Sequence, residues 1–194
     1  LTKLRQICCD PRLFYDGYAG GSAKLDTCME LLHNAVDGGH KVLLFSQFTS
    51  MLTLIEERLA AAKIASLTLT GATSKEERAR LVDTFQTGDV PVFLISLKAG
   101  GVGLNLTAAD VVIHYDPWWN VSAQNQATDR AHRIGQTRAV SVFKLICQDT
   151  IEERILQMQE RKHDLAESVL GGEGVGSTTL SREDVLALLD HEAE

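Results

Sequence analysis

The amino-acid sequence predicts an α/β protein with a mostly parallel sheet and helices on both faces. Three observations predict it: continuous apolar runs alternate with segments of helical periodicity, capping residues or glycines separate the two, and the loops are short. Continuous apolar runs are typical of strands that helices bury on both sides. With 194 residues, 44% hydrophobic and 23% charged, the chain can form one globular domain with an extension.

Helices are predicted where apolar residues recur three and four positions apart. A short helix over 1–9 should end at Asp10-Pro11, because the residue before a proline is pushed out of the helical region. Capping boxes, a Ser or Thr followed three positions later by Glu, open two further helices at Ser74 and Thr150. The helix positions before residue 91 that should face the core are Leu25, Cys28, Met29, Leu32, Val36, Leu52, Ile55, Leu59, Leu81, Val82 and Phe85.

Apolar runs predict the strands, and the remaining periodic segments predict three more helices. The strands are expected over 41–46, 66–70, 92–97, 111–115 and 140–147. The helices are expected over about 122–133, from Thr150 towards Gly171, and over 181–189. Ligands of open parallel sheets bind where the strands end, which directs attention to the loops at 47–50, at 98–105 and after Tyr115.

Charge and cysteine content narrow the classes of function. The net charge of −7 divides into −1 for residues 1–91, +2 for 92–148 and −8 for 149–194, so the centre is mildly basic and the tail acidic. The spacing of Cys8, Cys9, Cys28 and Cys147 favours free thiols in a reducing compartment over a zinc site. No apolar run approaches the ~18 residues that span a bilayer. Because the first residue is Leu1 and not Met, we expect a piece of a longer protein.

Two features suggest a site for phosphate groups. Gly100, Gly101 and Gly103 allow close approach of the backbone to an anion, although a loop that needs positive φ for its own geometry would show the same glycines. Arg130 and Arg133 lie three apart, so on a helix they project from one face. Two guanidinium groups suit a polyphosphate, and the alternative is a solvated helix face.

Aromatic and histidine side chains near these features remain ambiguous on sequence alone. Trp118 and Trp119 either stack at or brace a ligand-facing edge or pack under the following helix. We expect His132 to have a helix-surface or packing role and His114, near a strand end, to be structural.

Five motifs occur in one order along the chain: Phe45-Ser46-Gln47-Phe48, Gly71-Ala72-Thr73-Ser74, Ser96–Asn105, Asp116-Pro117-Trp118-Trp119-Asn120 and Gln126–Gln136. They resemble motifs IV to VI of the Swi/Snf-type ATPases, which are double-stranded-DNA translocases of helicase superfamily 2. The resemblance covers about residues 1–160, and the run from Asp129 to Gln136 is its most specific part. It implies an inter-lobe connector over 1–21, a second RecA-like helicase lobe over 22–148, a brace-like helix over 149–171, and a linker with a short terminal helix over 172–194.

The resemblance also implies roles for individual residues. The expected catalytic residues are two arginine fingers, which reach the γ-phosphate of ATP held by the other lobe, and the first residue of the same motif: Arg130, Arg133 and Gln126. The expected ATP-binding residues are Gly103, Asn105 and Asp129. The residues expected near the DNA backbone are Gln47, Thr49, Ser96, Lys98 and Gly100. No metal ligand is expected.

The expected function is that of the C-terminal half of an ATP-dependent double-stranded-DNA translocase, a chromatin-remodeller-like motor. Neither a P-loop nor an Asp-Glu-x-His stretch occurs, so ATP and Mg²⁺ should be held mainly by an N-terminal RecA-like lobe, and the isolated chain should be inactive. Expected partners are duplex DNA, that lobe and a protein displaced from DNA, with no membrane. The location would be cytoplasm or nucleoid in bacteria and the nucleus in eukaryotes. The alternatives are a non-catalytic nucleotide-sensing or protein-interaction module that uses the acidic tail, and an RNA helicase.

Overall fold

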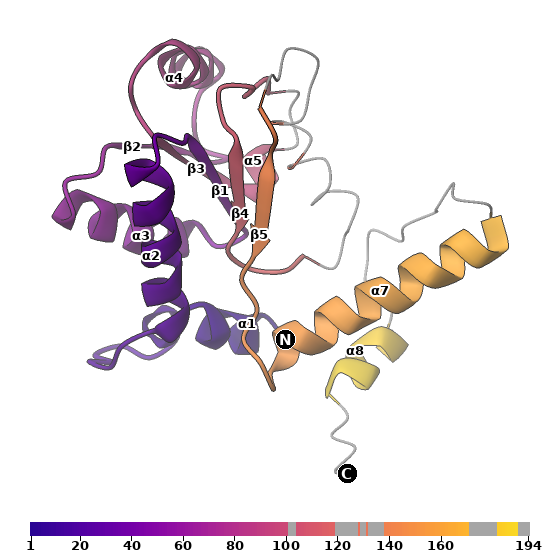
Figure 1. Ribbon diagram of the computed structural model, residues 1–194. Coiled ribbons are helices and arrows are strands. Elements are labelled where there is room, and N and C mark those ends of the chain that lie inside the picture. The colour runs from indigo at the N-terminus through magenta and orange to yellow at the C-terminus, as the bar shows by residue number, and fades with distance from the viewer. Residues whose placement is uncertain (101–103, 119–127, 129–130, 132–137, 171–181, 190–194) are drawn as a thin grey trace.

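A computed structural model describes residues 1–100, 104–118, 128, 131, 138–170 and 182–189 (Figure 1). Its centre is a five-stranded sheet of order β2-β3-β1-β4-β5 in which every neighbouring pair is parallel. The strands are β1 Val42–Ser46, β2 Ser66–Leu69, β3 Val92–Ser96, β4 Val111–His114 and β5 Ser141–Lys144. The predicted α/β class with a parallel sheet is therefore confirmed.

The described helices precede β1, lie between the strands from β1 to β4, and follow β5. They are α1 Thr2–Cys9, α2 Ala23–Asp37, α3 Thr49–Ala61, α4 Lys75–Thr87, the single turn α5 Leu97–Gly100, α7 Ile151–Leu170 and α8 Arg182–Leu189, with a 3₁₀ turn at Pro11–Leu13. Of the helix expected over 122–133, only Thr128 and Ala131 belong to the described residues, so that helix stays a prediction. Among the described residues, no helix is both long and apolar enough to cross a membrane.

The sheet separates two apolar clusters because successive side chains of a strand point to opposite faces. On one face, Val42 and Leu44 of β1 pack with buried residues of α2 and α3. On the other face, Leu43 and Phe45 pack with Phe85 of α4 and with residues of α5. Every residue of β1, β3 and β4 is buried, which explains why these strands read as continuous apolar runs.

The two edge strands are less buried than the centre. In β2 only Leu69 is buried, and all four residues of β5 are exposed, including Val142 and Phe143. The strand expected over 140–147 is shorter, because β5 pairs with β4 alone and β4 offers four residues to pair with.

Both predicted caps supply a hydroxyl to a helix start, but neither makes the reciprocal glutamate bond of a capping box: the Glu77 carboxylate bonds Arg80, and that of Glu153 bonds Asp149. The Ser74 hydroxyl accepts a hydrogen bond from the backbone N–H of Glu77 at 3.2 Å. At the start of α7, the Thr150 hydroxyl accepts from the N–H of Glu152 at 3.2 Å, while the Glu153 carboxylate accepts from Asp149 at 2.8 Å. The Glu153 carboxylate thus bonds the residue before the cap, Asp149, which has a positive φ of 55°.

The segments before and after the lobe both pack against it. Cys9 of α1 is fully buried in the core, and the Tyr115 hydroxyl donates to its carbonyl at 2.9 Å. Helix α7 extends away from the sheet with α8 beside it (Figure 1). Arg154 of α7 donates to the carbonyl of Leu188 in α8 at 3.1 Å. The domain limits at residues 21, 148 and 171 remain predictions.

Candidate functional site at the carboxyl edge of the sheet

A buried carboxylate, Asp116, lies where β1 and β4 end. Its side chain accepts a short hydrogen bond from the hydroxyl of Ser46 and one of 2.9 Å from the side-chain amide of Gln47. The backbone N–H of Gln47 adds a further bond at 3.2 Å. Burial raises the pKa of Asp116, because the charged form is poorly solvated, although these donors and Arg5 act against that shift. Asp116 therefore ties the loop after β1 to the segment after β4.

Arg5 of the N-terminal helix α1 completes this network. Its guanidinium donates to the carbonyl of Pro117 at 2.6 Å and to the side-chain oxygen of Gln47 at 2.9 Å, and it lies 3.7 Å from Asp116. Only 2% of Arg5 is exposed, and burial lowers its pKa. Sequence reasoning did not assign this role. The available signal was the four-residue spacing of Arg5 and Cys9, which places both on the buried face of α1.

The five residues expected near DNA differ in accessibility. Both ends of the Gln47 side chain are bonded inside the lobe, to Arg5 and to Asp116 and Pro117. Ser96 is 2% exposed, and its hydroxyl accepts from the N–H of Ala99 at 3.3 Å, at the start of α5.

The other three lie at the surface or at a helix end. Thr49 is exposed as the first residue of α3, and Lys98 is exposed on α5. Gly100 ends α5, the turn that Arg78 of α4 supports by donating to the carbonyl of Ala99 at 3.0 Å. Thr49 and Lys98 are thus the two of the five side chains that are open to a ligand, and Ser96 and Gln47 position their loops.

The nucleotide-facing candidates are described at one position only. Asn105 is exposed between Leu104 and Leu106, which are buried against the core under the α4 side of the sheet. Its side chain therefore points to solvent. Gly103, Gln126, Asp129, Arg130 and Arg133 lie outside the described residues, as does Trp119.

Two described residues, Thr128 and Ala131, flank Arg130 in the sequence. The Nε2 atom of His114 lies 2.9 Å from the hydroxyl oxygen of Thr128. Ala131 is fully buried in the same cluster as Phe45 and Val112. Thr128 and Ala131 are therefore both held against the sheet, Thr128 at the end of β4.

His114 is a buried neutral residue. It is 1% exposed and stacks on Phe45, with ring centroids 5.6 Å apart and planes 21° apart. Burial lowers the pKa of His114 to about 4, with a further contribution from Lys144, so its imidazole is uncharged at pH 7. Trp118 is partly buried and packs against the cluster that contains Phe45 and Ala131.

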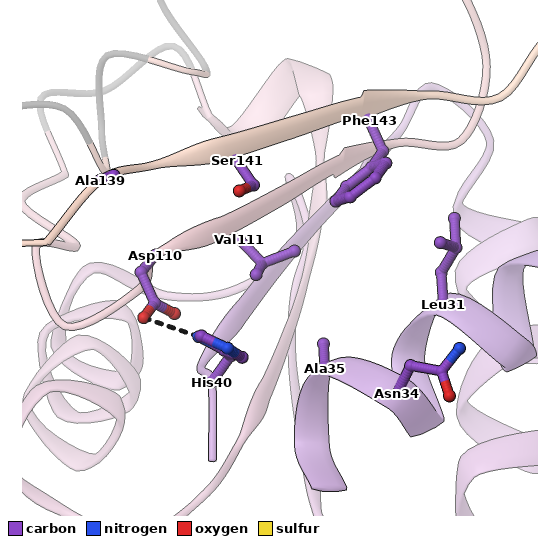
Figure 2. A pocket seen from close by; sticks show the side chains of 9 residues that line it. All are labelled: Leu31, Asn34, Ala35, His40, Asp110, Val111, Ala139, Ser141 and Phe143. Carbon is purple, nitrogen blue, oxygen red and sulfur yellow. Dashed lines mark hydrogen bonds and ion pairs between the residues drawn. The ribbon is translucent and has the colours of Figure 1, made fainter. Parts of the chain in front are cut away.

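A pocket of about 240 Å³ lies at the amino ends of β4 and β5, away from the strand ends described above (Figure 2). Phe143 and Val111 of the strands face Leu31 of α2 across it. Burial acts to raise the pKa of Asp110 at its rim, but hydrogen bonds from His40 and Arg138 outweigh it, and the pKa is lowered. None of the candidate residues that the structure describes lines this pocket.

The thiols and carboxylates of the described residues do not form a metal centre. No group of three or more His, Cys, Asp or Glu side chains in this part of the chain could hold an ion. The four cysteines are free thiols. Burial raises the pKa of Cys28 to about 12 and that of Cys147 to about 11, which keeps both protonated at neutral pH.

Comparison with known proteins agrees with this architecture. Residues 23–135 match the family of the helicase conserved C-terminal domain. The chain is 39% identical, over 98% of its length, to an uncharacterized ATP-dependent helicase of Mycoplasma pneumoniae, of which it covers 18%. It is 46% identical, over 89% of its length, to the chromatin-remodeling ATPase INO80 of Mus musculus, of which it covers 11%.

Solved structures show the same relationship. The whole chain superposes on 40% of the SWI2/SNF2 ATPase core domain of Sulfolobus solfataricus, with a TM-score of 0.77 and 36% identity. The same core in complex with double-stranded DNA matches 96% of this chain and 40% of its own, with a TM-score of 0.73 and 36% identity. The chain belongs to the helicase conserved C-terminal domain family. Within that family it is a C-terminal RecA-like lobe of the Swi/Snf type, as the sequence motifs predict.

Proposed function

We propose that this chain is the C-terminal half of an ATP-dependent double-stranded-DNA translocase and that it supplies two arginine fingers, Arg130 and Arg133. The observation that carries the proposal is the position of Thr128 and Ala131, which flank Arg130 in the sequence and are both held against the sheet. The chain spans less than a fifth of the two curated relatives above, so the activity belongs to a longer protein.

Helix geometry relates the anchors to the arginines. At 3.6 residues per turn, Thr128 and Ala131 share one face of the expected helix, and Arg130 and Arg133 share the roughly opposite face. With the anchors turned towards the core, the arginines would project away from it. A guanidinium aimed at a transferred phosphoryl group stabilises its developing charge and can be worth ~10³–10⁵ in rate.

The remaining candidates would lie around ATP bound between this lobe and the N-terminal lobe. ATP and Mg²⁺ would be held mainly by the N-terminal lobe, with Gly103, Asn105 and Asp129 facing the nucleotide and Gln126 ordering the motif. This division explains why the chain lacks a P-loop, and it implies that the isolated chain hydrolyses no ATP.

Contacts to DNA would run along the sugar-phosphate backbone. Thr49, Lys98 and the backbone at Gly100 would contact phosphates, whereas Gln47 and Ser96 would hold their loops in place. The solved complex of the related Sulfolobus core with double-stranded DNA supports this choice of nucleic acid. A displaced protein would be a further partner. Closing and opening of the two lobes around ATP would advance the motor along the duplex.

The test is ATP hydrolysis by the full-length protein with and without duplex DNA. Arg130→Ala and Arg133→Ala should each lower DNA-stimulated turnover by roughly 10³-fold or more. Arg80→Ala is the matched control, because Arg80 is exposed and pairs with Glu77 on the surface of α4. Unchanged turnover in both arginine variants would contradict the proposed motor function. Stimulation of ATP hydrolysis by RNA instead of duplex DNA would favour the alternative of an RNA helicase.

A further inference from the structure

We infer that Arg5 is a positioning residue that couples the connector helix α1 to residues 116–118, the segment that leads into the arginine-finger motif. The inference rests on the proposed function, because it concerns how movement between two lobes reaches that motif. Its evidence is a set of contacts that joins three parts of the chain at one guanidinium.

These contacts cross large distances in sequence. Arg5 donates to the Pro117 carbonyl, 112 residues away, at 2.6 Å, and to the Gln47 side chain, 42 residues away, at 2.9 Å. Gln47 in turn donates to Asp116 at 2.9 Å and to the Pro117 carbonyl at 3.1 Å. The Pro117 carbonyl therefore receives two donors, one from α1 and one from the loop after β1.

The choice of an arginine at this position has a geometric explanation. A planar guanidinium offers several N–H donors in a rigid fork, so one side chain can bond partners on two elements at fixed angles. Burial of a charged group is unfavourable unless its donors are satisfied, and an apolar residue could fill the same space at lower cost. A purely packing role for α1 would not require this group.

Two separate contacts hold the described residues on either side of this stretch of sequence. Arg5 and Gln47 bond Pro117, whose ring fixes its φ and makes it a stiff point of attachment. His114 bonds Thr128. Movement of α1 relative to the sheet would change the contact at Pro117 and leave the one at Thr128 in place, so α1 would act on residues 116–118.

The experiment compares Arg5→Lys with Arg12→Lys in the full-length protein. Both variants keep a positive charge on the connector and remove a forked arginine. Arg12 bonds Asp10 at 2.9 and 2.7 Å, and within the described residues its guanidinium donates to Asp10 alone, so it serves as the matched control. Two measurements are made on each variant: DNA-stimulated ATP hydrolysis, and hydrogen exchange of peptides across the lobe by mass spectrometry.

Arg5→Lys should lower the DNA-stimulated kcat at least tenfold with the KM for ATP within twofold of the unmodified protein. It should also speed exchange in the peptide after Pro117, with the β1 and β3 peptides protected as before. Arg12→Lys should change none of these quantities by more than twofold.

Two results would overturn the inference: equal kcat and exchange in the two variants, or loss of protection spread over all strands, which would mark Arg5 as a general stabilising residue. If the unmodified protein shows no DNA-stimulated hydrolysis, the proposed function fails on its own. The exchange measurement then still decides whether Arg5 holds the 116–118 segment.

Discussion

Lys24 and Glu152 form a buried ion pair that joins α2 to the start of α7. The Lys24 Nζ lies 2.5 Å from one carboxylate oxygen of Glu152 and 2.6 Å from the other, and the two side chains are 5% and 0% exposed. The same carboxylate accepts from the N–H of Cys147 at 3.0 Å, and the ammonium lies 5.3 Å from the centre of the Tyr115 ring. This pair fixes where the long C-terminal helix leaves the lobe.

Removing one partner of this pair should be strongly destabilising. Lys24→Met or Glu152→Leu leaves an uncompensated buried charge and should lower the free energy of unfolding by about 3–5 kcal/mol. The double variant should lose clearly less than the two single losses together, because it leaves no lone charge. Urea unfolding measures all three. The exposed pair of Arg58 and Asp26 is the control, since Asp26→Ala should cost under about 1 kcal/mol. Strictly additive losses at the buried pair would contradict this account.

The hydrogen bond between His114 and Thr128 should appear as a coupling energy. In a double-mutant cycle with His114→Gln and Thr128→Val, the interaction should be about 0.5–1.5 kcal/mol of unfolding free energy. Thr68→Val supplies the reference, because Thr68 bonds Glu56 on α3 and has no contact with His114. A coupling of zero would mean that the contact between His114 and Thr128 contributes nothing to stability.

The buried His114 also predicts a pH dependence. Its folded-state pKa of about 4 lies below the ordinary value of 6.5, so between these values the unfolded chain binds more protons than the folded one. The stability that the neutral imidazole contributes is therefore lost as the pH falls through this window. Between pH 7 and pH 5 the unmodified chain should lose about 2 kcal/mol more than His114→Gln, on the order of the linkage expected for such a shift. If the free energy of unfolding fell equally with pH in the two proteins, the prediction for His114 would be refuted.

Loss of the α4 cap should have a moderate effect. Ser74→Ala removes the acceptor for the Glu77 N–H and should cost about 1 kcal/mol. Ser50→Ala is the comparison, because Ser50 is exposed within α3 and is not its cap, so its effect should stay within about 0.5 kcal/mol. Equal effects of the two substitutions in thermal or urea unfolding would argue against a capping role for Ser74.

Much of the fold could be predicted because its signals are local. The i, i+3, i+4 pattern placed Leu25, Cys28 and Leu32 on the buried face of α2, where the structure has them. The short continuous apolar runs correctly predicted β1 and β3, because strands covered on both faces need apolar residues at every position.

The candidate site was less accessible to sequence reasoning. The glycine loop and the arginine segment could be recognised by their motifs, but Ser96 and Gln47 have their side-chain polar groups bonded within the lobe. Neither residue type nor spacing distinguishes a side chain that contacts a ligand from one that holds a loop. That distinction depends on burial, which only the packed structure provides.

The sequence by itself determined the kind and order of the strands and of most described helices and, through its motifs, the family, because periodicity, caps and short motifs act over a few residues. The single turn α5 was not predicted, since it begins in the expected strand over 92–97 and ends in the expected loop over 98–105. The tertiary structure decided which distant residues meet: Arg5 with Pro117, Lys24 with Glu152, and His114 with Thr128. It did so through the strand order β2-β3-β1-β4-β5, which brings the ends of β1 and β4 side by side. Many strand orders satisfy the same local pattern, so these contacts follow from the assembled sheet and from no single stretch of chain.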